Sequence, residues 1–208
     1  MGLYFKVKRI FDFMYALIGL IVLMPLFVLI GIIIKIDSRG PIFFNQRRIG
    51  KDKKEFNMLK FRTMRRDTPD NVPTHQMKEP GKYITRVGKV LRKTSLDELP
   101  QFINILKGDM SFVGPRPALY NQDDLVKERE KYGVHQVLPG VTGWAQVNGR
   151  DTLPIPDKAK LDGEYIKHFG LSTDAKLLVK TVFAILKSDG VVEGGTGALE
   201  NSHTDKQL

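Results

Sequence analysis

The sequence predicts a mostly helical α/β protein that is anchored to a membrane by its N-terminal segment. Residues 13–34 contain no charged side chain, and a helix of these 22 residues would be about 33 Å long, enough to cross a bilayer core. Further along the chain, short strand-like runs are followed by several amphipathic helical patterns. Of the 208 residues, 42% are hydrophobic and 27% are charged, which is typical of a globular domain.

Charge and cysteine content narrow the functional classes. The chain carries 33 Lys and Arg against 23 Asp and Glu, a formal net charge of +10. This balance indicates an anionic partner such as nucleic acid, anionic lipid or a phosphorylated substrate. The chain has no cysteine, so disulfides, thiolate catalysis and cysteine-based metal sites are excluded. Its four scattered histidines lack the spacing of a zinc site.

The uncharged run is interrupted by Pro25, which removes a backbone hydrogen bond and is expected to bend the helix. Cations flank the run on both sides: Lys6, Lys8, Arg9, Lys35 and Arg39. Positive charge favours the cytoplasmic side of a membrane. A re-entrant hairpin that breaks at Pro25 places both charged flanks on the cytoplasmic side, whereas a kinked spanning helix places only one of them there. A buried soluble helix is the third interpretation. We expect residues 1–36 to form a re-entrant membrane helix.

The next segment is strongly basic, because residues 35–66 hold eleven cations and only three acids. Residues 41–44 and 56–64 are expected to form two short strands. Since side chains alternate along a strand, Lys60 and Arg62 are expected on the same face. Two fixed cations on one face suit a diphosphate, and a solvated face near lipid head groups is the alternative.

Two adjacent carboxylates, Asp97 and Glu98, follow the basic region where a helix is expected to begin. Acidic residues are common at such positions because they complement the free N–H groups of the first turn. Ser95 and Glu98 also match the S-x-x-E capping box. Taken alone, the pair is an ordinary helix cap. A catalytic dyad is the alternative, and it depends on what surrounds the pair.

Arg116 lies between Pro115 and Pro117, in a segment that cannot form a regular helix. The two prolines restrict the backbone and hold the arginine in a fixed place. A rigid arginine near a carboxylate pair suits an anion clamp. A surface turn with a structural arginine is the plainer interpretation.

Apolar residues recur with helical spacing in much of the remaining chain. The expected helices are residues 83–93, 99–106, 121–132, 157–169 and 173–188. Residues 137–150 are glycine-rich and irregular, and they lack both glycine fingerprints of nucleotide-binding loops. Residues 67–82 are expected to form a loop. The polar residues 189–208 are expected to be a disordered tail, which leaves residues 37–188 as the main domain.

Considered together, these features resemble the small monotopic phosphoglycosyl transferases, bacterial sugar transferases that start capsule, exopolysaccharide and glycan assembly. The resemblance covers about residues 5–188 and includes the proline inside the hydrophobic helix. It rests on motifs that occur in the family's order: Lys60-Phe-Arg-Thr-Met64, Ser95-Leu-Asp-Glu-Leu-Pro-Gln101, Leu106-Lys-Gly-Asp-Met-Ser111, Gly114-Pro-Arg-Pro117, Pro139-Gly-Val-Thr-Gly143, Gln146-Val-Asn-Gly-Arg150 and Asp162-x-x-Tyr165.

This resemblance implies that Asp97 is the nucleophile, that Glu98 is its partner, and that the two hold Mg²⁺. Family members attack the β-phosphate of a UDP-sugar, release UMP, and pass the sugar-phosphate from the aspartate to polyprenol (undecaprenyl) phosphate. The resemblance also implies a re-entrant hairpin and a catalytic domain on the cytoplasmic face of the bacterial inner membrane. The residues expected to bind substrate are Lys60, Arg62, Arg92, Pro115, Arg116, Pro117 and Arg150.

Two positions depart from the family pattern: Met24 stands where Ser often precedes the proline, and Leu138 stands where Arg often precedes Pro-Gly-x-Thr-Gly. Residues 67–71 and 117–122 look most like the capsule branch that transfers acetamido-deoxy sugars. The sugar itself stays open.

The expected partners are a UDP-sugar, polyprenol phosphate and the lipid bilayer, with no nucleic acid; a homodimer stays open. A non-enzymatic, basic membrane scaffold is the main alternative to the transferase. A nucleic-acid-binding domain also agrees with the net charge of +10. The hydrophobic helix and the lack of a basic recognition helix argue against it.

Overall fold

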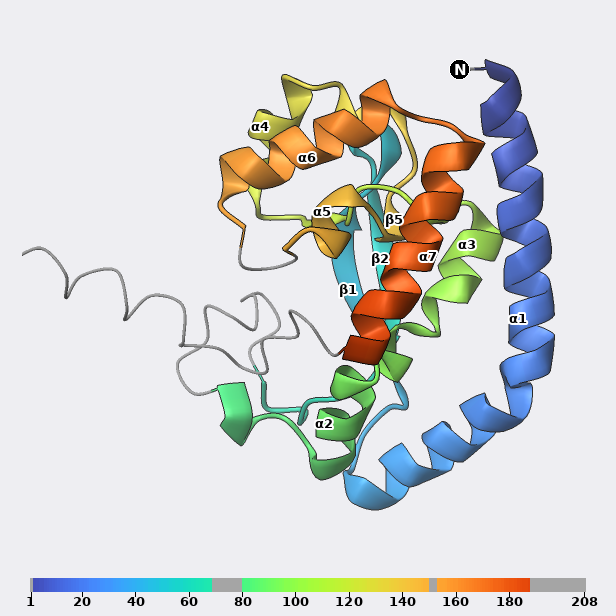
Figure 1. The fold of residues 1–208 in the computed structure, drawn as a ribbon. Coiled ribbons are helices and arrows are strands. Elements are labelled where there is room, and N and C mark those ends of the chain that lie inside the picture. The colour runs from blue at the N-terminus through green and yellow to red at the C-terminus, as the bar shows by residue number, and fades with distance from the viewer. Residues whose placement is uncertain (1, 69–79, 150–152, 188–208) are drawn as a thin grey trace, which may run out of the picture.

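The computed structural model describes residues 2–68, 80–149 and 153–187 of the chain (Figure 1). Most of the expected loop at residues 67–82, Arg150 and the expected tail at residues 189–208 lie outside the described residues. Within them, a long N-terminal helix lies along the outside of a domain built from shorter helices and two small sheets. This agrees with the predicted mostly helical α/β class.

The uncharged run forms the centre of helix α1, Gly2–Asp37, which has Pro25 in its interior. The helix is bent rather than straight, and its lower part runs under the domain towards α2 (Figure 1). Pro25 accounts for a bend because it cannot donate the usual backbone hydrogen bond and its ring crowds the preceding turn. In the described part of the chain, α1 is the one helix long and apolar enough to cross a membrane.

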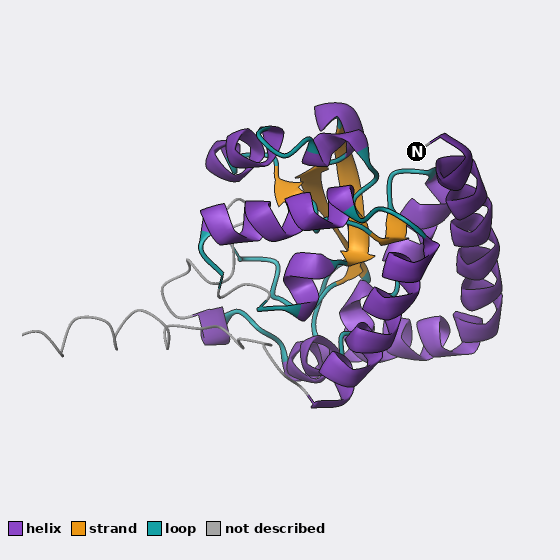
Figure 2. Cartoon of the chain, turned by 45° about the horizontal axis from the view of Figure 1, so that its top comes forward, coloured by secondary structure: helices purple, strands orange, loops and turns teal. Residues whose placement is uncertain are grey.

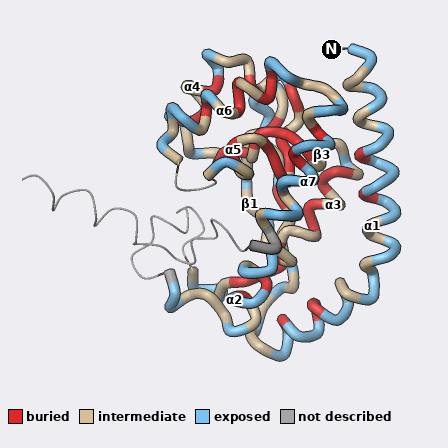
Figure 3. The backbone as a smooth tube through the Cα atoms, viewed as in Figure 1, coloured by how far each residue is buried: buried red, intermediate tan, exposed pale blue. Residues whose placement is uncertain are grey.

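Most of α1 is exposed along its length, as the pale blue tube in Figure 3 shows. Large apolar side chains face outward, among them Ile18, Ile21, Val22, Leu29 and Ile32. A contiguous apolar surface of this size marks a site of contact with a membrane or a protein. The interpretation of α1 as a buried soluble helix is therefore wrong, and the protein has a surface suited to membrane association.

Two short sheets lie inside the domain, enclosed by helices (Figure 2). The antiparallel sheet has the order β2-β1-β4, with β1 at Phe43–Ile49, β2 at Glu55–Phe61 and β4 at Ala118–Leu119. The parallel pair is β3, Ser111–Val113, with β5, Gly140–Thr142. The two predicted strands exist, but the first extends to Ile49 and the second ends at Phe61. The pairing with β4 joins the basic hairpin to the segment that follows Arg116.

The predicted helices are confirmed, with shifts of one to three residues at most ends. They are α2 at Arg86–Lys93, α3 at Gln101–Lys107, α4 at Asp123–Glu130, α6 at Ile155–Lys167 and α7 at Leu171–Lys187. The glycine-rich segment also contains a short helix, α5 at Trp144–Val147. Gly108 ends α3 in the left-handed conformation, with φ 93°, as expected for a glycine cap.

The core consists of three apolar clusters; α1 contributes buried residues to two of them, and its Phe5 packs against the third. Ala16 packs with Met58, Ile105 and Met110, while Ile30 and Ile34 pack with Phe61 and Leu91. The third cluster, around Val113 and Tyr165, joins β3 to α6 and α7. Buried residues accordingly gather in the middle of the domain (Figure 3). Both halves of α1 are thus fixed to the domain that carries the carboxylate pair.

Candidate active site

The carboxylate pair lies in a short 3₁₀ turn, Leu96–Glu98, between α2 and α3. Ser95 takes the left-handed conformation, with φ 57°, and its side chain makes no capping hydrogen bond. The expected capping box is therefore wrong. Helix α3 begins only at Gln101, with Pro100 at its N-cap. The carboxylate pair therefore lies one turn before α3. Pro100 has a helical backbone geometry but no side-chain acceptor that could cap the helix.

Glu98 is held by two cations that come from different parts of the chain. Its Oε1 accepts a hydrogen bond from Nζ of Lys60 at 2.9 Å and another from Nη2 of Arg116 at 2.8 Å. Lys60 belongs to β2, and Arg116 belongs to the loop between β3 and β4. Burial alone would raise the pKa of Glu98, but Arg116 and Lys60 hold it well below its usual range. Glu98 is therefore a firmly ionised carboxylate.

Asp97 has a different environment, although it is the neighbouring residue. It is 8% exposed, and among the described residues its carboxylate takes part in no hydrogen bond or ion pair. Burial raises the pKa of Asp97 and the nearby Glu98 raises it further, while Lys60, Arg92 and Arg116 act against this rise. Asp97 is thus a desolvated carboxylate surrounded by cations, with its oxygens available.

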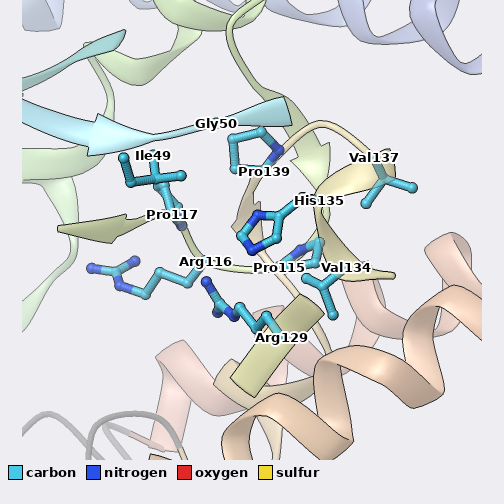
Figure 4. A pocket seen from close by; sticks show the side chains of 10 residues that line it. All are labelled: Ile49, Gly50, Pro115, Arg116, Pro117, Arg129, Val134, His135, Val137 and Pro139. Atoms are coloured by element: carbon cyan, nitrogen blue, oxygen red, sulfur yellow. The ribbon is translucent and has the colours of Figure 1, made fainter. Parts of the chain in front are cut away.

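The segment around Arg116 is fixed by hydrogen bonds to the backbone carbonyls on both sides of it. The carbonyl of Pro115 accepts from the N–H of Gly140 at 3.0 Å, and the carbonyl of Pro117 accepts from Nη1 of Arg48 at 2.9 Å. Pro115, Arg116 and Pro117 also line a small cavity (Figure 4). The predicted rigid arginine beside the pair is confirmed. The prolines act by positioning Arg116.

These elements bring together the features of a site for an anionic substrate, and comparison with known proteins names the family. The family described as bacterial sugar transferase matches residues 3–188. The chain belongs to this bacterial sugar transferase family.

Several curated members of the family are similar to this transferase. It is 38% identical over 186 residues to the uncharacterized sugar transferase EpsL of Bacillus subtilis, covering 88% of this chain and 89% of EpsL. It is 42% identical over 183 residues to a UDP-glucose:undecaprenyl-phosphate glucose-1-phosphate transferase of Escherichia coli, covering 85% of this chain and 39% of that protein.

A third relative is the UDP-N-acetylgalactosamine-undecaprenyl-phosphate N-acetylgalactosaminephosphotransferase of Aeromonas hydrophila. It is 39% identical over 194 residues, which cover 90% of this chain and 45% of that protein. The transferase therefore spans nearly the whole length of EpsL, but less than half of the length of the other two relatives.

Arg92 of the transferase approaches the pair from α2. Thr85 caps this helix by accepting a hydrogen bond from the N–H of Gly88 at 2.9 Å. At Gly88 the helix lies directly on the backbone, because a Cβ there would be 2.0 Å from the carbonyl oxygen of Thr63. This close approach sets the position of α2. Arg92, in its last turn, lowers the pKa of Asp97 by its charge, as expected for a cation at the site.

Arg62 does not join the site, so its prediction as a substrate-binding cation is not supported. The strand β2 ends at Phe61, so alternation no longer places Lys60 and Arg62 on one face. The guanidinium of Arg62 is buried and donates to the carbonyls of Ser38 and Arg39 at 2.7 Å and 2.6 Å. Arg62 therefore binds the segment that directly follows α1, and it also donates to the carbonyl of Ile34 in the last turn of α1 at 3.4 Å, where free carbonyls need donors.

A buried ion pair that the sequence pattern did not predict lies behind the Arg116 segment. Arg129 of α4 donates from Nε and Nη2 to Oδ2 of Asp162 in α6, at 2.8 Å and 2.6 Å. Arg129 is 3% exposed and Asp162 is fully buried. The charged residues of α4 indicated a solvated helix. The sequence signal that could have predicted this burial is Leu125. It lies four residues before Arg129, so the two side chains share one face of α4, and both are buried.

Among the described residues, no group of three or more His, Asp or Glu side chains could hold a metal ion by itself. Mg²⁺ differs from most metals in this respect, because one or two carboxylates together with substrate phosphates often suffice. The unengaged carboxylate of Asp97 and the second oxygen of Glu98 supply ligands of that type. The residues present therefore fit Mg²⁺ bound jointly with a diphosphate.

Proposed function

We propose that this chain transfers a sugar-1-phosphate from a UDP-sugar to a polyprenol phosphate and releases UMP, with a covalent intermediate on Asp97. The unequal environment of the two carboxylates carries the proposal. Lys60 and Arg116 engage Glu98 in ion pairs, whereas Asp97 is buried with its oxygens unengaged. A carboxylate that is desolvated and unengaged is suited to nucleophilic attack.

In the first step, an oxygen of Asp97 attacks the β-phosphorus of the UDP-sugar. The bond from this phosphorus to the bridging oxygen breaks, and UMP leaves with the electron pair. In the second step, a phosphate oxygen of the polyprenol phosphate attacks the same phosphorus, which regenerates the carboxylate of Asp97 and forms the polyprenol diphospho-sugar. Phosphorus–oxygen bonds of similar transfer potential form and break in both steps, so each step is close to energetically balanced.

Both steps bring one anion towards another, so cations are required. Lys60, Arg92 and Arg116 all act electrostatically on Asp97, and fixed cations stabilise charge on a transferring phosphoryl group most effectively where water is excluded. Mg²⁺, held by Asp97 and Glu98 together with the diphosphate, would neutralise further charge on the phosphate oxygens. Glu98, by pairing with Lys60 and Arg116, holds these two cations in place before the substrate arrives.

We further propose that α1 is re-entrant and that the domain lies on the cytoplasmic face of the inner membrane. Near its start, Arg9 of α1 donates to the carbonyls of Ile105 and Leu106 in α3. Near its end, Asp37 accepts from the N–H of Val87 in α2 at 3.2 Å. A helix that crossed the bilayer would place these two ends on opposite sides. Contact of both ends with one domain favours a helix that enters and leaves on the same side.

The named relatives differ in their sugar, since glucose appears for one and N-acetylgalactosamine for another. The decisive experiment therefore measures UMP release from a panel of UDP-sugars, with polyprenol phosphate and Mg²⁺ present. We expect turnover with at least one sugar, and a covalent protein–sugar-phosphate adduct when the polyprenol phosphate is omitted. Asp97→Asn is nearly isosteric and should abolish both. UMP release by Asp97→Asn at the wild-type rate would contradict the assignment of the nucleophile.

A further inference from the structure

A buried carboxylate outside the site connects the start of α1 to the rest of the domain. Asp174 of α7 is 6% exposed. Its Oδ2 accepts hydrogen bonds from the hydroxyl of Tyr4 at 2.8 Å and from Nζ of Lys8 at 2.5 Å. Its Oδ1 accepts from the hydroxyl of Tyr165 in α6 at 2.9 Å. Asp174 therefore joins three helices at one point.

The same group of residues holds the strand β3. The hydroxyl of Tyr165 also lies 3.1 Å from the carbonyl oxygen of Val113 and shares its single hydrogen between this oxygen and Asp174. From the other side, Oδ1 of Asp12 in α1 accepts from the N–H of Phe112 at 3.3 Å. Two consecutive residues of β3 are thus bound, one to α6 and one to α1.

Strand β3 leads directly to the catalytic arginine. Gly114 donates its N–H to the carbonyl of Thr142 at 2.8 Å, and Pro115 accepts from Gly140 at 3.0 Å. A Cβ on Gly114 would lie 2.4 Å from the carbonyl oxygen of Leu138, so this backbone has no room to shift. Arg116 follows and donates to Glu98 at 2.8 Å. If β3 moved, Arg116 would therefore be expected to move with it by a similar distance.

Stability alone is a weak reason to bury so many polar groups. A buried ion pair such as Lys8 with Asp174 often contributes little net free energy, because desolvation offsets the Coulomb attraction. Such groups do fix relative positions, since hydrogen bonds have strict geometry. The network connects α1, which in the described part of the chain is the one helix suited to a membrane, with the strand that leads to Arg116.

We propose that Tyr165 and Asp174 are positioning residues that fix β3 to α1 and thereby hold Arg116 against Glu98. The inference rests on the proposed function, because it assigns these residues a role in sugar-phosphate transfer. It predicts that the hydroxyl of Tyr165 affects the transfer rate only through Arg116.

A double-mutant cycle tests this prediction. The variants are Tyr165→Phe, Arg116→Lys and the combination, and the readout is the rate of UMP release by the full chain in liposomes. We expect Tyr165→Phe to lower the rate roughly tenfold, since small displacements of a catalytic group have effects of this size. In the Arg116→Lys background the same substitution should change the rate by less than about twofold. An equal loss in both backgrounds, or no loss in the wild-type background, would overturn the proposal.

Tyr132→Phe is the matched control, because Tyr132 packs against the same apolar cluster and, among the described residues, its hydroxyl forms no hydrogen bond with β3. It should leave the rate unchanged. If Tyr165→Phe does not fold, Tyr4→Phe replaces it, since this change removes a single hydrogen bond to Asp174 at the partly exposed start of α1. UMP release by Asp97→Asn, measured alongside, separates failure of the proposed reaction from failure of the positioning role.

Discussion

Asp97 and Glu98 are adjacent in the sequence, but their carboxylates have different environments. Lys60 and Arg116 bind Glu98 and keep the pKa of its carboxyl low, whereas burial raises the pKa of Asp97. Pairs whose environments move their pKa values apart commonly divide the chemical work of a site between them. Here the ionised Glu98 organises the cations, and Asp97 remains available to the substrate.

This difference predicts opposite effects of two similar substitutions on stability. In the unfolded chain, Asp97 ionises with a pKa of about 3.9. The raised pKa in the folded state makes its ionisation unfavourable for folding at neutral pH. Asp97→Asn should therefore raise the Tm at pH 7 while UMP release falls to below about one thousandth. The gain should vanish below about pH 4, where the carboxyl is protonated in both states.

Glu98→Gln is the matched comparison. It removes the negative charge that Lys60 and Arg116 share and should cost about 2 kcal/mol of unfolding free energy at pH 7. Since the folded pKa of Glu98 is depressed, this contribution is present above its unfolded pKa of about 4.3 and is lost as the pH falls. Chemical denaturation at several pH values measures both variants. Equal shifts for the two would contradict the division of roles.

The raised pKa of Asp97 also predicts the acid side of the activity profile. Asp97 must be ionised to act as the proposed nucleophile, so kcat/KM for UMP release should fall as the pH drops through the pKa of Asp97 in the free enzyme. This fall should occur at a higher pH than an ordinary aspartate would give. Lys60→Met removes a charge that lowers the pKa of Asp97, and it should move the fall to still higher pH. A shift to lower pH would show that another group is titrating.

At the scale of elements, close packing of α2 on the backbone of Thr63 determines where Arg92 lies. Gly88→Ala would place a methyl group 2.0 Å from the carbonyl oxygen of Thr63, so α2 would have to move. We expect a loss of about 1–3 kcal/mol in unfolding free energy and a lower rate of UMP release. Gly81→Ala is the control, because a Cβ there meets nothing within 4 Å. Unchanged stability of Gly88→Ala would show that α2 is free to shift.

The elements that sequence reasoning predicted well are those set by local pattern. The helices, the glycine cap at Gly108 and the rigid Arg116 follow from periodicity, backbone preference and proline chemistry. Partnerships between distant segments were not predictable in this way. Arg62 binds the end of α1, and Arg129 binds Asp162, because the fold brings them together. Ser95 does not act as a cap because its backbone is left-handed, whereas a capping residue typically has an extended backbone.

At the scale of the molecule, the bent α1 encloses one side of the domain (Figure 1). The proposed re-entrance predicts that both ends of α1 face the same compartment. Because the chain has no cysteine, Gly2→Cys and Asn45→Cys each provide a single thiol at an exposed position. In sealed vesicles, an impermeant thiol reagent should label both variants from the same side, with the unmodified chain as the blank. Labelling from opposite sides would mean that α1 spans the bilayer.

The hydrogen bonds from α1 to Asp174 also bear on the order in which the protein folds. Tyr4 and Lys8 reach this residue across 170 and 166 positions of the chain. Because α1 is synthesised before the rest of the domain, Tyr4 and Lys8 can bind Asp174 only after almost all of the domain has been synthesised. Contacts of such long sequence separation are slow to form. Attachment of the first turns of α1 through Tyr4 and Lys8 is therefore expected to be a late folding event, and a chain truncated before Asp174 should lack it.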